Sequence, residues 1–450
     1  MTVAAAPDLL LEVADRVLAR VPDSAEAEVT VTNGQEALTR FARSFIHQNV
    51  ADAGAAIRLR LCLDGRLASA TANQTDDAAL DRLVRGAVEA ARVSPLDPGW
   101  PGLAPPEAVP DVGHWDDATA DADPDARAQR VRAFVDACEG LEAAGYCSTS
   151  GVTTAFANSA GQRAVGRTTV AQLDGIARTP TSDGNGRAAS FRLSALDGES
   201  LGLQAARRAR NASDPIDLEP GRYEVVLAPG CVANMLTFLV IYGFNGRAIE
   251  EGRSFVRLGE RQFDAAVNLR DDVADPISVG IAFDAEGTPK RRLDLVRDGT
   301  TSAACHDRRT AKAMGVATTG HAIPDAAEWG AVANNLIFAP GEQTPDDLVA
   351  AVERGLLVSD FWYTRILDPR TQVVTGLTRN GVWLVEDGQI TRPVRNLRFT
   401  QSYLEALAPE AVRGIGSDLS LQPAGTFGPG PYAVPSLRLA SWNFTGGARG

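Results

Sequence analysis

Alternation of apolar and polar residues marks the first part of the chain as rich in strands. The stretch AEVTVTNGQEALTRFARSFIHQNV, residues 27–50, has two alternating runs around Asn33-Gly34, and GAAIRLRLCLDGRLASATAN, residues 54–73, repeats the pattern around Asp64-Gly65. Asn-Gly and Asp-Gly steps favour the tight turns of β-hairpins. We therefore predict a hairpin at each step, followed by a helix over residues 76–95, where the apolar spacing becomes helical and ends at a proline.

Both patterns recur further along the chain. Helical spacing predicts helices over residues 124–141 and 199–212, with strand-like alternation over 146–178 between them. In the last half, a strand ending near Pro229 is followed by the apolar run MLTFLVIYGF, and a short helix ends at Gly315. Strand pairs are predicted to meet at three further turn signals: Glu286-Gly287, Asp298-Gly299 and Asp387-Gly388.

These elements predict an α+β protein of several domains, since 450 residues exceed what one core usually holds. We expect an N-terminal α/β domain with β-hairpins over residues 1–98 and a linker rich in proline and glycine over 99–118. A small middle α/β domain over 119–216 and a mostly-β C-terminal domain over 217–450 complete the prediction.

Composition narrows the class of protein. The net charge of −13 argues against a nucleic-acid-binding surface, which needs clustered Lys and Arg. The five cysteines are odd in number and show no CxxC spacing, which is typical of a reducing compartment. No apolar run approaches the roughly 18 residues of a membrane span, and the N-terminus lacks the pattern of a signal peptide. We therefore expect a soluble cytoplasmic protein.

Motifs for catalysis are weak. The four histidines lie at positions 47, 114, 306 and 321, and no two have the spacing of a helical ligand pair, so we expect no metal site in this chain. GESLG, residues 198–202, matches a nucleophile elbow in letters, but the buried strand such an elbow requires does not precede it. Ser200 is more simply explained as a residue at the start of a helix. The sequence also contains no glycine-rich motif of the kind that binds nucleotides.

The order of several landmarks resembles the TldD/PmbA metallopeptidase family, whose known members form a two-subunit zinc enzyme. The landmarks are RFARSFIHQNV with the following hairpin, PGRYEVVLAP before an apolar helix, FDAEGTPKRRLDLVRDGTTSAACHDRRTAKAMGVATTGHA, and VWLVEDGQITRPVRNLRF. They cover nearly all of the chain in order. The resemblance implies that the helix after PGRYEVVLAP lines a chamber.

The resemblance also implies a role for this chain. In the zinc-bearing branch that helix carries HExxxH and a later cysteine completes the site, whereas here Thr237, Phe238 and Tyr242 take the His, Glu and His positions. No cysteine follows Cys305. The chain thus resembles the metal-free, PmbA (TldE)-like subunit, with zinc and general base expected in a TldD-like sibling and peptide or unfolded protein as substrate. Thr237, Phe238 and Tyr242 are therefore the candidate chamber-lining residues, and His321 is a candidate substrate contact.

Other interpretations stay open. The loop EGRSF, residues 251–255, is as typical of the zinc-bearing branch, which allows descent from a zinc-bearing ancestor. A homo-oligomeric family member with a non-proteolytic role in peptide or natural-product maturation is the main alternative. A serine hydrolase acting through Ser200 is a third.

Overall fold

The first half of the chain forms a six-stranded antiparallel sheet. The computed structural model describes residues 6–324, 326–423 and 430–447. The strand order is β3-β2-β1-β4-β5-β6. These strands are β1 (Ala25–Ala42), β2 (Phe45–Leu63), β3 (Arg66–Ala72), β4 (Glu142–Asn158), β5 (Arg163–Arg178) and β6 (Asp183–Ser190). Alternate residues of β1, among them Ala27, Val29 and Val31, are buried, so one face of the sheet carries a hydrophobic core.

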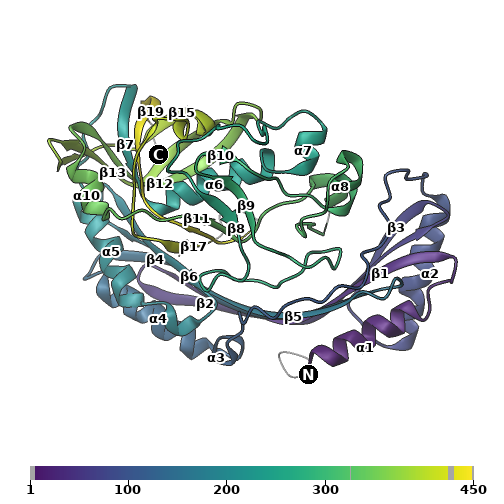
Figure 1. The fold of residues 1–450 in the computed structure, drawn as a ribbon. Coiled ribbons are helices and arrows are strands. Elements are labelled where there is room, and N and C mark those ends of the chain that lie inside the picture. The colour runs from purple at the N-terminus through teal and green to yellow at the C-terminus, as the bar shows by residue number, and fades with distance from the viewer. Residues whose placement is uncertain (1–5, 325, 424–429, 448–450) are drawn as a thin grey trace.

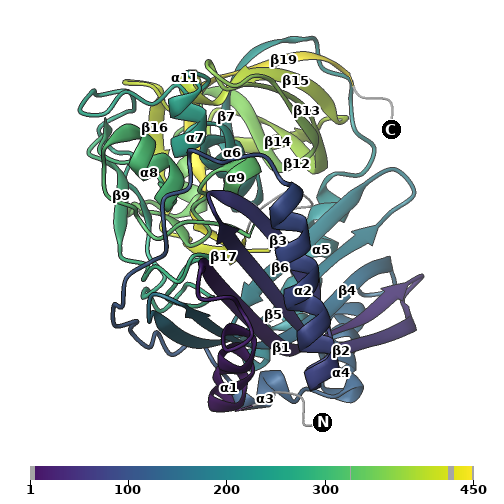
Figure 2. The ribbon, with the colours of Figure 1, turned by 90° about the vertical axis from the view of Figure 1, so that its right-hand side faces the viewer.

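Helices cover that face of the curved sheet, and the C-terminal elements lie over the other face (Figure 1). The helices are α1 (Pro7–Leu18), α2 (Asp77–Val93), α3 (Asp117–Ala120), α4 (Pro124–Ala137) and α5 (Gly198–Asn211), with a 3₁₀ turn at Leu193–Ala195. Figure 2 shows α2 lying across the strands of the N-terminal hairpins. Two separate hydrophobic clusters result, one under α1 and α2 and one between α4, α5 and the sheet.

The predicted linker over residues 99–118 lies between α2, which covers the first cluster, and α4, which covers the second. The strands themselves do not separate there, because β1 pairs with β4 from Glu28 to Phe41. The segments predicted as N-terminal and middle domains therefore contribute to one continuous sheet, each with its own helices.

The C-terminal half contains two further sheets. One has the order β10-β9-β8-β11-β18-β17, and the other has the order β12-β7-β19-β15-β13-β14, which closes into a partial barrel through pairing of β12 with β13. The first set is β8 (Leu269–Asp271), β9 (Leu293–Arg297), β10 (Thr300–Thr301), β11 (Leu336–Phe338), β17 (Ser420–Gln422) and β18 (Tyr432–Val434). The second is β7 (Gly221–Leu227), β12 (Arg354–Asp368), β13 (Val373–Glu386), β14 (Gln389–Pro393), β15 (Leu397–Ser402), β16 (Val412–Ile415) on its edge, and β19 (Leu437–Gly447). This confirms the predicted α+β class.

One helix lies between these two sheets. Helix α6 (Pro229–Tyr242) contacts β7 and β12 of the barrel and also β17 and β18 of the other sheet. The remaining helices are short: α7 (Gly246–Glu250), α8 (Arg308–Met314), α9 (Ala326–Trp329), α10 (Pro345–Ala350) and α11 (Tyr403–Ala406). None of the helices in the described ranges has the length and apolar character needed to cross a membrane.

Most predicted turns are confirmed, and one is wrong. The chain reverses at Asp64-Gly65, Asp298-Gly299 and Asp387-Gly388 with positive φ at each residue. Glu286-Gly287 also lies in a turn, closed by the Asp284 N–H donating to the Thr288 carbonyl.

The predicted Asn33-Gly34 hairpin does not form, because β1 runs straight through it and the chain turns at Arg43-Ser44. Glycine is needed at position 34 for another reason. A Cβ there would lie 2.4 Å from the carbonyl oxygen of Gly151 on β4.

Candidate functional site

Helix α6 forms where the sequence predicts it, and its position explains its composition. Pro229 fits the first helical turn, where its missing N–H is not needed. The helix ends before Gly243, whose N–H donates to the Leu239 carbonyl. One side is fully packed: Cys231, Val232, Met235, Leu236, Leu239 and Val240 are buried in the main core. Apolar residues therefore hold α6 between two sheets.

The other side of α6 is only half buried. It carries Asn234, Thr237, Phe238, Ile241 and Tyr242, whose spacing of three and four residues puts them on one face of a helix. The rings of Phe238 and Tyr242 stack with centroids 6.2 Å apart and planes at 18°. The Thr237 hydroxyl donates to the Ala233 carbonyl of its own helix. The three residues predicted at the degenerate metal positions thus share a partly accessible face.

Two hydrogen bonds that the sequence analysis did not identify hold this side of α6 against buried residues. The Tyr403 hydroxyl donates to the Asn234 side-chain oxygen at 3.1 Å, and the Asn234 amide donates to the Thr364 hydroxyl at 3.0 Å. Burial raises the pKa of Tyr403 well above its usual range, so its hydroxyl stays protonated and donates. Asn234 lies one turn before Phe238 on α6, which is the signal that could have identified it.

His321 lies elsewhere, in a buried contact with Asp271. Its side chain is 0% exposed, and its Nε2 lies 3.1 Å from Oδ1 of Asp271 on β8. Its Nδ1 lies 3.0 Å from the Thr319 hydroxyl. Burial acts to raise the pKa of Asp271, but the charge and hydrogen bond of His321, with smaller contributions from Lys290 and the Asn335 amide, hold it below its usual value. In this structure the His321 side chain is out of reach of a peptide.

The donor groups in the described part of the chain do not converge as a catalytic zinc ion requires. Such an ion needs three protein ligands converging on one point. Within residues 6–324, 326–423 and 430–447, no group of three or more His, Cys, Asp or Glu side chains is placed to hold a metal. At α6 the corresponding positions offer a hydroxyl and two aromatic rings. We therefore derive no metal-dependent step for this chain.

Ser200 has the geometry of a helix start. It lies in the first turn of α5, and its N–H donates to the side chain of Asp197, the N-cap residue. A short 3₁₀ turn at Leu193–Ala195, and not a buried strand, precedes it. A nucleophile elbow requires a strand leading directly into the serine, so this geometry gives a serine hydrolase no support.

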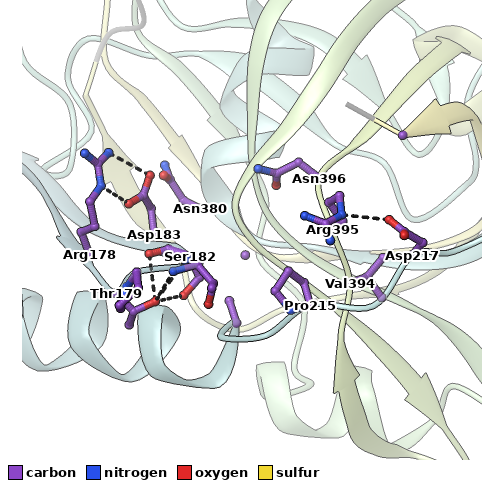
Figure 3. Close-up of a pocket in the computed structure, with 15 residues that line it drawn as sticks. Arg178, Thr179, Ser182, Asp183, Pro215, Asp217, Asn380, Val394, Arg395 and Asn396 are labelled. Atoms are coloured by element: carbon purple, nitrogen blue, oxygen red, sulfur yellow. Dashed lines mark hydrogen bonds and ion pairs between the residues drawn. The ribbon is translucent and has the colours of Figure 1, made fainter. Parts of the chain in front are cut away.

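A polar cavity of about 1020 Å³ lies between the β5–β6 hairpin and the barrel. Figure 3 shows two arginine–aspartate pairs on its opposite sides, Arg178 with Asp183 and Arg395 with Asp217. Hydroxyls of Thr179 and Ser182 bond to each other within it. Because its charges are already paired, the cavity has no evident catalytic group.

Two sets of buried charges join the C-terminal half to the first sheet. At one end of the sheet, Arg60 contacts Glu28 at 2.6 Å and Glu286 of the predicted turn at 3.1 Å. At the other end, Arg187 on β6 donates two bonds to Asp360 on β12, at 2.7 and 3.3 Å. These contacts fix the barrel and α6 above the sheet. Sequence patterns could not have paired groups so distant along the chain.

Comparison with family models and curated sequences gives consistent results. A model described as the PmbA/TldA metallopeptidase C-terminal domain matches residues 220–446, and one described as PmbA/TldA metallopeptidase domain 1 matches residues 27–91. The chain is 26% identical over 224 residues to a metalloprotease TldD homolog of Haemophilus influenzae and 25% identical over 253 residues to a metalloprotease of Synechocystis. It spans about half the length of these relatives, 46% and 52%.

Solved structures match the fold along its whole length. TldE from Thermococcus kodakarensis superposes with a TM-score of 0.86 at 18% identity, covering 98% of this chain and all of that one. A Thermotoga maritima protein, named as a candidate modulator of a DNA gyrase, superposes with a TM-score of 0.85 at 15% identity, covering 97% of this chain and 100% of its own. At these identities the matches show a shared fold.

Proposed function

The chain belongs to the PmbA/TldD metallopeptidase family, and we propose that within it the chain is a TldE-like subunit without catalytic metal. It would assemble in the cytoplasm with a TldD-like sibling that supplies zinc and general base. Its own task would be to form one wall of the peptide chamber, with Thr237, Phe238 and Tyr242 lining it. The observation that supports this most is the half-buried face of α6, which carries Thr237, Phe238 and Tyr242 at the positions that the resemblance gives to the His, Glu and His of HExxxH.

The chemistry of that face suits holding a peptide and not cleaving one. Stacked rings offer apolar and edge-to-face contacts to side chains, and the Asn234 amide adds a hydrogen-bonding group beside them. Neither can activate water as a metal with three protein ligands does. Peptides or unfolded proteins are therefore the substrates we propose for the assembly.

Purification of the tagged chain from its own cells tests this proposal. We expect a sibling bearing HExxxH in equal amount, zinc in the complex, and peptidase activity that the isolated chain lacks. In that complex, Phe238→Ala should raise KM for peptide several-fold with little change in kcat, while Leu203→Ala, at an exposed site on α5, should change neither. Stoichiometric zinc and high activity in the isolated chain would overturn the proposal.

A further inference from the structure

Strand β2 has a long edge that no other strand covers. It pairs with β1 along its whole length, but β3 reaches only Ile57–Leu63 on its other side. In the described part of the chain, the outer edge of residues 45–56 thus has no strand partner. A register shift skips His47 near the hairpin end, which leaves Gln48–Ala56 as a regular stretch of open backbone. At about 3.4 Å per residue this edge is roughly 30 Å long.

This edge lacks the usual devices that keep edges from pairing. Proteins protect free edges with lysine, proline, bulges or a covering element. The sequence QNVADAGAA, residues 48–56, contains neither lysine nor proline, and nearly all of its residues are exposed. Its side chains are mostly small, so they leave the backbone donors and acceptors accessible. Such an edge is a template for one more strand.

A groove begins next to the open edge and crosses β1 and β4 to β5, on the face of the sheet opposite its helices. Its volume is about 480 Å³. Gln48, Val50 and Asp52 of β2 line it together with Glu36, Leu38 and Arg40 of β1. Because side chains alternate along β1, these even-numbered residues share a face with Glu28, whose partner Arg60 also contacts Glu286 of the C-terminal half. The groove therefore opens on the same face of the sheet as these charges.

Two carboxylates in this groove, Glu36 and Asp52, form no ion pair with a basic side chain in the described ranges of the chain. Glu36 and Asp52 are direct partners across β1 and β2, and both line the groove. Like charges placed directly opposite in a sheet are destabilising. The nearest basic residue on the same face of β1, Arg40, instead donates to Gln48 at 3.4 Å. A cation from outside the chain would complement the pair.

From these features we propose that the open edge of β2 binds an extended, basic polypeptide segment. The segment adds to the sheet as a further strand through backbone hydrogen bonds over Gln48–Ala56. One of its lysine or arginine side chains enters the groove between Glu36 and Asp52. Pairing through the backbone tolerates many sequences. A pocket that receives every second side chain of the added strand distinguishes between them. Identifying this segment as substrate rests on the proposed function, whereas the binding site itself does not.

Binding to the isolated full-length chain tests this inference without any peptidase activity, so the sibling and its zinc do not affect the result. The probe is a fluorescent ten-residue peptide of serine, threonine and alanine with one central lysine, followed by anisotropy. We expect it to bind about tenfold more tightly than the same peptide with glutamate at the centre. Methylating alternate backbone nitrogens should abolish binding in one of the two possible series, because only one series points toward β2.

Variants locate the site. Glu36→Gln combined with Asp52→Asn should remove the preference for lysine, while the matched pair Glu12→Gln with Glu89→Gln, exposed residues of α1 and α2, should retain it. Circular dichroism verifies that each variant is folded. Equal binding of lysine and glutamate peptides, indifference to both methylated series, or no binding at millimolar peptide would each overturn the inference.

Discussion

Glu28 connects protonation to stability at a single residue. Its side chain is buried at the contact between the first sheet and the C-terminal half. Burial raises the pKa of Glu28 to about 7, the charge of Arg60 opposes that rise and the charge of Glu286 adds to it. The folded protein therefore binds a proton that the unfolded chain, with an ordinary pKa near 4.5, has already released.

Glu28 should therefore lower stability as the pH rises from about 5 to about 7. Replacing Glu28 with Gln removes this dependence. The free energy of unfolding of Glu28→Gln, relative to that of the parent, should therefore rise by on the order of 2 kcal/mol from pH 5 to pH 8. Guanidinium unfolding midpoints across that range measure the difference. Glu89→Gln, an exposed change on α2, should follow the parent at every pH. A constant difference between the Glu28 variant and the parent would contradict the assignment.

At the scale of elements, local signals predicted most of the helices and turns. Asp307 accepts from the Thr310 N–H at the start of α8 and Gly315 is left-handed at its end, as the sequence indicates. The Asn33-Gly34 prediction failed because an Asn-Gly step reports only local turn preference. The close approach of β4 to Gly34 comes from sequence more than a hundred residues away, which no local pattern contains.

Gly34 and Gly54 provide a matched test of that explanation, since they are direct partners across β1 and β2. A Cβ at Gly34 would lie 2.4 Å from the Gly151 oxygen and 2.9 Å from the Val152 Cα, which are backbone atoms that cannot move aside singly. A Cβ at Gly54 would meet nothing within 4 Å. Gly34→Ala should lower the free energy of unfolding by about 2 to 3 kcal/mol. Gly54→Ala should leave it unchanged or raise it by about 0.5 kcal/mol. Similar unfolding midpoints for both variants would contradict this account.

For the whole molecule, the order of landmarks along the chain predicted the family, and the family models confirm it. Composition and residue spacing could not predict how elements distant in the sequence pack against one another. The linker suggests two independent domains, yet β1 and β4 join them in one sheet. Likewise, α6 was predicted as a helix, but its half-buried face depends on Thr364 of β12 and Tyr403 of α11, which are distant in sequence.

The stability of the whole molecule should depend strongly on the contact between Arg187 and Asp360. Asp360 is 4% exposed and also accepts from the Asn380 amide at 3.1 Å. Removing one partner leaves a buried charge with too few partners. Asp360→Asn and Arg187→Met should therefore each lower the free energy of unfolding by about 3 to 5 kcal/mol.

The double variant should cost clearly less than the sum, because it removes both charges of this pair and only the more exposed Asp174, 3.5 Å from the Arg187 Nε, loses a partner. Hydrogen exchange should then increase in β6 and β12 before it increases in β3, which lies at the far edge of the sheet. Since Gly230 at the start of α6 packs against Asp360, each single variant should also loosen the first turn of that helix. Additive costs, or uniform exchange across the sheet, would mean that this pair does not hold the two halves together.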